Sequence, residues 1–275
     1  MREVLEAALA AEAAGTPAAM VTVVSTSGST PQKAGARMLV RGDGAIVGTI
    51  GGGCLEAEMT WRAREAITAR RSKLVAYDLT PDQAGDDGLV CGGRMQVFIE
   101  PIEGTPCLCL FGAGHVAQPL ARMAKACGFR VEVADDRIKF ANAERFPDAD
   151  RIVVDDVAAA AEKLSLGPNA YAVIVTRGHK GDGEALRAVV GRGLRFVGLL
   201  GSKPKVVHIF AALKEEGVPA EDLARVHAPI GLSIGAVSPE EIAVSILAEM
   251  IAVRRGVDPA GSGSMRMALP GRLAT

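Results

Sequence analysis

The residue best placed for chemistry in this chain is a cysteine that follows a run of glycines. Cys54 comes directly after Gly51, Gly52 and Gly53, where a helix is predicted to begin. At a helix N-terminus a thiol loses its proton more readily, and backbone N–H groups favour an anion. Three consecutive glycines are costly in chain entropy, so the backbone there must turn unusually or approach something closely.

Two further loops carry similar residues. Cys91 precedes Gly92 and Gly93, and the loop 27–35 offers the hydroxyls of Ser29 and Thr30 after a predicted strand. Together the three loops suit an anionic ligand that bears sulfur or a metal, with Cys54 and Cys91 as the thiols of interest. Close backbone packing is the alternative explanation for the glycines.

A second candidate site has the fingerprint of a dinucleotide-binding turn. The apolar strand 107–111 leads into Gly112, Gly114 and His115, and a helix follows. Asp135 and Asp136 come about 20 residues later, after the next strand, where a carboxylate that binds ribose is expected. The glycines allow a tight turn, and the helix N-terminus presents N–H groups to a phosphate.

Two loops after later strands are expected at the same sheet edge, because the carboxyl ends of parallel strands meet there. The first loop holds Arg177, His179 and Asp182, and the second holds Ser202 and Lys203. We assign all five to ligand binding, with a solvated helix cap as the alternative for the second loop.

The remaining cysteines show no sign of a site. Cys107 and Cys109 alternate along a buried strand and Cys127 ends a helix, so all three are expected to be inert core residues. No two cysteines have C-x-x-C spacing, which argues against a structural zinc site.

The elements that carry these residues fall into two domains. Residues 1–103 predict a small mixed α/β domain, with an opening helix that ends at Gly15 and a hairpin with Asp43-Gly44 at its turn. From residue 107 to 256, short apolar strands alternate with helices, which predicts a Rossmann-like, doubly wound parallel sheet. Residues 257–275 are rich in glycine, serine and proline and predict a disordered tail.

The net charge and aromatic content of the chain exclude two classes of function. The net charge is −1 and aromatic residues make up 4% of the chain, which argues against binding nucleic acid or a membrane surface. The N-terminal segment carries glutamates where a signal peptide needs an apolar stretch, so a cytoplasmic location is expected.

Several long motifs in the order found here resemble the XdhC/CoxI family, the accessory proteins of xanthine dehydrogenase-type molybdoenzymes. Two positions depart from its pattern, Gln32 where arginine is frequent and Ser233 where aspartate is frequent. The resemblance covers residues 18–255, and its blocks are GSTPQKAGARMLV (28–40), GTIGGGCLEAE (48–58), VCGGRMQVFIEP (90–101), FGAGHVAQPLARMAKACGFRVEVADDR (111–137), TRGHKGD (176–182), GLLGSKPK (198–205) and APIGLSIGAVSPEEIAVSILAEMIA (228–252).

This resemblance implies a chaperone rather than an enzyme. Such a protein would bind molybdenum cofactor, as molybdopterin or its nucleotide form, with Cys54 and Cys91 as the candidate metal contacts. It would protect the cofactor while its terminal sulfur ligand is installed. It would then hand the cofactor to an apo-molybdoenzyme, with a cysteine desulfurase as the sulfur source. The Rossmann-like half would hold the nucleotide or phosphate end, or form a homodimer.

Two other hypotheses remain open from the sequence. The same glycine turn could serve an NAD(P)-dependent oxidoreductase, which tight NAD(H) binding and turnover of a carbonyl or alcohol would favour. The chain could also be a sulfurtransferase in which Cys91 carries a persulfide, which would add 32 mass units to that residue.

Overall fold

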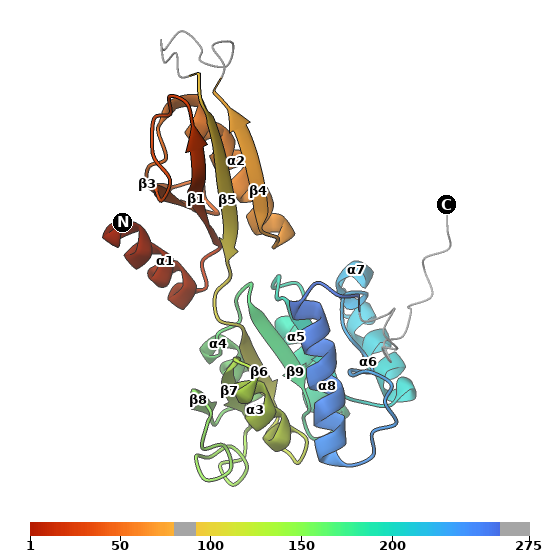
Figure 1. Cartoon of the computed structure of the whole chain (residues 1–275). Helices are drawn as coiled ribbons and strands as arrows, with labels where there is room; N and C mark the ends of the chain where they lie inside the picture. The colour runs from red at the N-terminus through yellow and green to blue at the C-terminus, as the bar shows by residue number, and fades with distance from the viewer. Residues whose placement is uncertain (80–91, 259–275) are drawn as a thin grey trace, which may run out of the picture. The chain divides into compact units, whose positions relative to one another are not determined.

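A computed structural model describes residues 1–79 and 92–258 of the chain. The chain forms two compact units, unit 1 from Met1 to Thr105 and unit 2 from Pro106 onward (Figure 1). The predicted tail beyond residue 258 lies outside the described residues, and so does Cys91. Among the described helices none is long and apolar enough to cross a membrane.

Unit 1 is a five-stranded antiparallel sheet with one helix on each face. The strands lie in the order β3-β2-β1-β5-β4. Helix α2 packs its apolar side on one face of β1, β2 and β5, and α1 covers part of the other face. The elements of unit 1 are α1 (Arg2–Ala14), β1 (Ala18–Ser27), β2 (Arg37–Arg41), β3 (Ile46–Gly48), α2 (Gly53–Ala69), β4 (Lys73–Asp78) and β5 (Arg94–Ile102).

The sequence explains these elements locally. Helix α1 ends at Gly15, which adopts the left-handed conformation that glycine tolerates at a helix C-terminus. Strands β2 and β3 pair as the predicted hairpin, and Gly44 has a φ of 91° in its turn. In β1 and β5 alternate side chains are buried against α2, as period-2 geometry requires.

Unit 2 is a five-stranded, all-parallel sheet in the order β10-β9-β6-β7-β8. The chain runs from β6 to β7 and β8 on one side and returns to β9 and β10 on the other, which is the Rossmann order, so the predicted doubly wound fold is confirmed. The elements are β6 (Cys107–Phe111), α3 (Ala117–Ala126), β7 (Arg130–Ala134), β8 (Arg151–Val153), α4 (Val157–Lys163), β9 (Ala170–Ile174), α5 (His179–Val189), β10 (Phe196–Leu199), α6 (Lys203–Glu215), α7 (Ala220–Leu223) and α8 (Pro239–Arg254).

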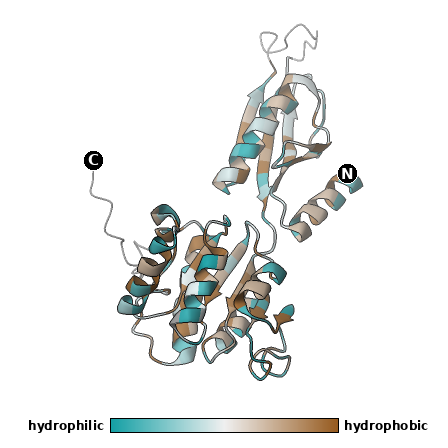
Figure 2. Cartoon of the chain, turned by 180° about the vertical axis from the view of Figure 1, so that it is seen from behind, coloured by the Kyte–Doolittle hydropathy of each residue, from teal (hydrophilic) through white to brown (hydrophobic). Residues whose placement is uncertain are grey.

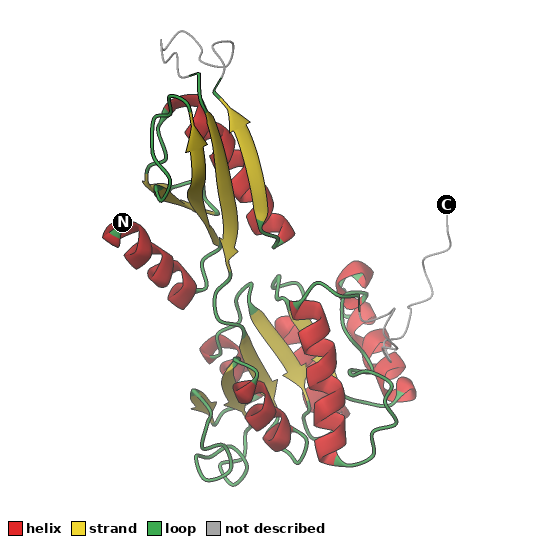
Figure 3. Ribbon diagram, in the orientation of Figure 1, coloured by secondary structure: helices red, strands yellow, loops and turns green. Residues whose placement is uncertain are grey.

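Helices cover both faces of the unit 2 sheet (Figure 3). α3 and α8 pack on one face, and α4, α5 and α6 pack on the other. Strands β6 and β9 lie between these layers and are buried at every position, and the strands of this sheet are strongly hydrophobic in Figure 2. Ser238 and Glu241 form the predicted capping box at the start of α8.

Two buried ionisable pairs join elements of unit 2. Glu249 of α8 is fully buried, contacts His227 Nδ1 at 2.9 Å and accepts a hydrogen bond from the N–H of Gly231 at 2.6 Å. Asp182 of α5 is also fully buried and pairs with Lys205 of α6. Because a buried charge without a partner is costly, both carboxylates fix the positions of the segments that satisfy them.

Candidate functional site

In unit 1 the predicted loops meet at one end of the sheet. A Cβ atom on Gly93 would lie 2.2 Å from the carbonyl oxygen of Ser29, and one on Gly51 would lie 2.5 Å from Cγ of Pro31. The segments around residues 28–31, 51 and 93 therefore touch each other through close backbone packing. Close packing accounts for glycine at positions 51 and 93.

Three other glycines of these loops have room for a side chain within the described structure. Apart from the adjoining residues of their own chain segment, no described atom lies within 4 Å of a Cβ placed on Gly52, Gly53 or Gly92. Gly52 has a φ of 76° and Gly53 a φ of 58°, in the left-handed region that side chains disfavour. Glycine is needed at 52 and 53 for the backbone path, and within the part of the chain that the structure describes nothing fills the outer side of this turn.

Cys54 lies on this open side. It is the second residue of α2, and its thiol is exposed. The N-cap of α2 is Gly52, which has no side chain to accept a hydrogen bond, and the N–H groups of Gly53, Cys54 and Leu55 have no acceptor within the helix. The turn thus presents the Cys54 thiol and the exposed backbone of Gly53 and Cys54 to solvent, whereas Leu55 is buried.

A residue that the sequence analysis missed fills the inner side of the same turn. One carboxylate oxygen of Glu56 accepts hydrogen bonds from Thr49 Oγ1 at 2.5 Å and from the N–H groups of Gly52 at 2.9 Å, Ile50 at 3.0 Å and Gly51 at 3.3 Å. Burial works to raise the pKa of the Glu56 carboxyl, but these hydrogen bonds outweigh it and hold the pKa below its ordinary value. Glu56 is therefore a half-buried carboxylate that fixes the turn.

Tyr77 of β4 was also missed by the sequence analysis. Burial raises the pKa of its phenol, and electrostatic interactions with the nearby Cys54 and Glu58 raise it further. The phenol stays protonated at neutral pH and remains a hydrogen-bond donor near Cys54. Spacing gives no signal for this residue, because strand β4 reaches α2 only in the folded sheet.

In unit 2 the glycine turn sits at the carboxyl end of β6. Gly112 has a φ of 109°, and a Cβ there would lie 2.5 Å from the carbonyl oxygen of Val175, so the end of β9 packs directly against the turn. Gly114 faces open space within the described structure, and His115 is exposed beside it. The turn combines a close backbone contact with an open outer surface.

The two predicted ribose carboxylates have different surroundings. Asp135 accepts hydrogen bonds from the N–H of Ala113 at 2.8 Å and from the guanidinium of Arg137, with its side chain 4% exposed. Burial works to raise the pKa of Asp135, but the bonds from Arg137 and Ala113 prevail and lower it. Asp136 instead has a side chain that is 67% exposed. Asp135 locks the glycine turn, and Asp136 is accessible.

The predicted loop after β9 divides in the same way. Arg177 is exposed and His179 begins α5, whereas Asp182 is buried and accepts hydrogen bonds from the backbone N–H and the hydroxyl of Thr176. Ser202 and Lys203 are both exposed at the start of α6. Of the five residues assigned to these loops, Asp182 therefore has a structural role, because it links the Thr176 loop to α6 from a buried position.

A cavity of about 300 Å³ opens at this edge of the sheet. It is lined by Phe111, Gly112, Ala134, Asp135, Asp136, Arg137, Asp155, Asp156, Val157, Ala160, Thr176, Arg177, Lys180, Gly181 and Glu184. These residues follow β6, β7, β8 and β9, which places the cavity where ligands bind in open α/β sheets.

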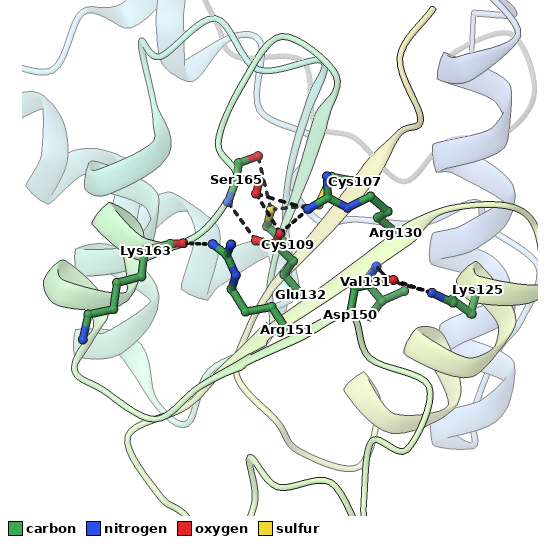
Figure 4. A network of polar contacts seen from close by, with 10 residues as sticks. All are labelled: Cys107, Cys109, Lys125, Arg130, Val131, Glu132, Asp150, Arg151, Lys163 and Ser165. Carbon is green, nitrogen blue, oxygen red and sulfur yellow. Dashed lines mark hydrogen bonds and ion pairs between the residues drawn. The ribbon is translucent and has the colours of Figure 1, made fainter. Parts of the chain in front are cut away.

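The opposite edge of the sheet holds a buried polar network (Figure 4). Glu132 is fully buried and accepts hydrogen bonds from Arg130 at 2.8 Å and from the N–H and hydroxyl of Ser165 at 2.8 and 2.7 Å. The thiols of Cys107 and Cys109 lie 3.8 Å apart next to it. Because three donors already satisfy Glu132, the network ties β7 to the end of α4 without a further ligand.

The thiols differ in accessibility. Cys107 and Cys109 are buried in the core as expected. The pKa of the Cys109 thiol is raised well above its ordinary value, mainly by its hydrogen bond with Cys107 and then by burial. The expectation of a buried Cys127 was wrong, because it forms the C-cap of α3 and is exposed. Helix ends lie at the surface, where an apolar residue type does not ensure burial.

Comparison with known proteins identifies relatives of both units. A family model described as "XdhC Rossmann domain" matches residues 108–250, and one described as "XdhC and CoxI family" matches residues 11–78. A crystal structure described as a xanthine dehydrogenase from Bacillus halodurans is 26% identical, has a TM-score of 0.51 and covers 94% of this chain and 97% of that chain.

Three curated proteins are similar in sequence. "Uncharacterized protein YqeB" of Escherichia coli is 40% identical over 86% of this chain, which spans 44% of YqeB. A Bacillus subtilis protein named as a probable xanthine dehydrogenase subunit is 26% identical over 87% of this chain and 94% of its own length. "Molybdenum cofactor insertion chaperone PaoD" of Escherichia coli is 22% identical over 92% of this chain and 88% of its own length. The two family models together match most of units 1 and 2, so the chain belongs to the XdhC and CoxI family.

Proposed function

We propose that this protein binds molybdenum cofactor as a cargo and inserts it into an apo-enzyme of the xanthine dehydrogenase type. It protects the cofactor while the terminal sulfur ligand is installed. The names of two relatives support this proposal, one as a molybdenum cofactor insertion chaperone and one as a probable xanthine dehydrogenase component. No covalent step on a substrate is needed, so the protein acts as a chaperone.

The observation that carries the proposal is the Gly51–Cys54 turn. It exposes a thiol, leaves the N–H groups of the first turn of α2 without acceptors in the helix, and is open on its outer side at Gly52 and Gly53. A thiolate is a soft ligand suited to a thiophilic metal, and clustered backbone donors suit the phosphate of the pterin. The residues present therefore fit a metal-bearing anion.

Glu56 limits where that anion can bind. Its carboxylate already takes the N–H groups of Ile50, Gly51 and Gly52. The donors left for the cargo are those of the exposed residues Gly53 and Cys54, with the neutral phenol of Tyr77 nearby. Glu56 holds the turn in shape and Cys54 contacts the cargo. Ser29, Thr30, Gly92 and Cys91 complete the proposed site, although Cys91 lies outside the described residues.

The partners follow from the same role. The proposal requires an apo-molybdoenzyme as the acceptor and a cysteine desulfurase as the sulfur donor. It also includes a homodimer, whose formation analytical ultracentrifugation of the purified chain measures directly.

The matched variants Cys54→Ala and Cys127→Ala test the site. Both thiols are exposed, but Cys54 lies in the turn of unit 1 and Cys127 ends a helix of unit 2. After anaerobic purification from a host that makes the cofactor, oxidation converts bound pterin into a fluorescent derivative. We expect Cys54→Ala to lose most of the bound pterin and Cys127→Ala to keep it. Equal retention by both variants would show that Cys54 does not hold the cargo.

The rival function, an NAD(P)-dependent oxidoreductase, gives a different result in the same experiment. It predicts NAD(P)(H) in place of pterin in the wild-type protein, with no effect of Cys54→Ala on the bound nucleotide.

A further inference from the structure

Two buried thiols lie side by side on the central strand of unit 2 (Figure 4). Cys107 and Cys109 belong to β6, and their Sγ atoms are 3.8 Å apart. Their spacing lacks the C-x-x-C pattern of common zinc sites, but residues two apart in a strand point to the same face of the sheet. Both thiols accordingly belong to one core cluster, on the face that α4, α5 and α6 cover. The strand thus brings together two soft metal ligands that a helix or loop motif would not reveal.

The distance between the two sulfur atoms matches the edge of a tetrahedral metal site. Two Zn–S bonds of about 2.3 Å at the tetrahedral angle place their sulfur atoms about 3.8 Å apart. The Sγ atoms of Cys107 and Cys109 have this separation as they stand. Ligand atoms of Cys107, Cys109 and Glu132 all lie within 4.8 Å of one another, so a single ion can contact all three residues.

Glu132 keeps one position for such an ion. Its network with Arg130 and Ser165 holds together without a ligand and uses three hydrogen bonds, two on Oε1 and one on Oε2. A carboxylate offers about four lone-pair positions, so among the described contacts the second position of Oε2 remains. The carbonyl oxygen of Ser165, 3.8 Å from Cys109 Sγ, is the candidate fourth ligand.

The charges around the thiols favour a divalent cation. With both thiols protonated, Glu132 and Arg130 balance each other. A divalent cation that displaces two thiol protons leaves the cluster neutral, because its charge equals that of the two new thiolates. A monovalent cation would leave one uncompensated negative charge beside the fully buried Glu132, which is costly. Thiolate ligands also disfavour Mg²⁺ and Ca²⁺, which prefer oxygen.

We propose that Cys107, Cys109 and Glu132 bind a thiophilic divalent cation, with Zn²⁺ as the ion of matching geometry, and release the two thiol protons. The bound ion joins β6 to β7 and, through Ser165, to the segment after α4. Cys107, with 5% of its surface exposed, is the ligand nearest to solvent, and the ion enters past it or during folding. This inference goes beyond the proposed function, because none of these residues belongs to the cargo site.

Titration with Co²⁺, which occupies Zn²⁺ sites and absorbs light when thiolates bind it, tests the proposal. The full-length variant Cys54→Ala/Cys91→Ala/Cys127→Ala keeps only Cys107 and Cys109 of the five cysteines. We expect thiolate-to-Co²⁺ charge-transfer absorption at one ion per chain, in the native protein or after refolding from urea with Co²⁺. Zn²⁺ should abolish this absorption, and Zn²⁺ added to the metal-free variant should release two protons per ion. Excess Mg²⁺ should leave the absorption unchanged.

A matched pair of substitutions in this variant tests the carboxylate. Glu132→Gln should weaken Co²⁺ binding by at least about tenfold, because a neutral amide is a weaker ligand than a carboxylate. Glu144→Gln, at an exposed glutamate of unit 2 outside the cluster, should leave the affinity unchanged. Circular dichroism shows whether each variant folds, and if Glu132→Gln does not, the absorption of the parent variant still decides.

Two results would overturn the proposal. One is the absence of thiolate-to-Co²⁺ absorption both in the native variant and after refolding, and the other is equal Co²⁺ affinity of Glu132→Gln and Glu144→Gln. Pterin retention by Cys54→Ala is a separate measurement on a separate site, so this proposal and the proposed function fail independently.

Discussion

Replacing Glu56 by glutamine removes the negative charge from the turn that presents Cys54. Glutamine keeps an acceptor oxygen of the same reach, so the change isolates the charge. In the wild-type protein four donors converge on one carboxylate oxygen, at distances from 2.5 to 3.3 Å. Hydrogen bonds to a charged acceptor contribute about 1.5–3 kcal/mol and neutral ones about 0.5–1.5 kcal/mol. Because the donors share one oxygen, we expect a loss of roughly 1–2 kcal/mol in the free energy of unfolding of unit 1.

Fluorescence measures this loss in unit 1 alone. Trp61 is the single tryptophan of the sequence, and it lies on α2, with 56% of its surface exposed. Urea unfolding followed by its emission at neutral pH therefore reports on unit 1. The control is Glu58→Gln on the same helix, where a half-exposed pair with Arg62 should contribute less than about 0.5 kcal/mol.

The pH dependence has a definite sign. The pKa of Glu56 is lower in the folded protein than its ordinary value of 4.5, so the stability it provides is present above that value. It is lost as the pH falls through the folded pKa. The difference between wild type and Glu56→Gln should therefore shrink below pH 4.5. A difference within about 0.5 kcal/mol at neutral pH, the range of ordinary surface substitutions, would refute the role of Glu56.

Three further predictions concern unit 2 and the thiols. Gly112→Ala should destabilise unit 2 by about 2–4 kcal/mol in calorimetry, because its Cβ would meet the Val175 carbonyl, whereas Gly114→Ala should change little. Lys205→Met should cost about 3–5 kcal/mol by leaving Asp182 buried without its cation, and the exposed Lys203→Met should have almost no effect in the same measurement. Iodoacetamide should label the exposed Cys54 and Cys127 in the native protein, as determined by peptide mass spectrometry. It should spare the buried Cys107 and Cys109 until urea unfolds the protein, and labelling of Cys109 in the native protein would contradict its burial.

The fold of unit 2 could be predicted from the sequence because its signals are local. Apolar strands alternating with helices predict a parallel sheet, and the structure confirms that sheet and the turn at Gly112. The capping box at Ser238 is another signal contained within a few residues. Such patterns need no knowledge of distant parts of the chain.

The partners of the site residues could not be predicted, because they depend on the folded geometry. Asp135 and Asp136 are adjacent and identical in type, yet Asp135 is locked to Ala113 and Asp136 is exposed. The hydrogen bonds from Ile50, Gly51 and Gly52 to Glu56 form only when the folded turn directs all three N–H groups toward its carboxylate. A glutamate in the first turn of a helix after a glycine run was the available signal.

We propose that this protein carries molybdenum cofactor, and the cofactor content of the purified chain tests this most directly. The protein would be expressed in a host that makes the cofactor, purified anaerobically, and assayed for molybdenum and for the fluorescent pterin derivative. We expect both at close to one per chain, and direct titration with the cofactor would detect binding too weak to survive purification. Absence of pterin by both measurements, with NAD(H) bound in its place, would contradict it.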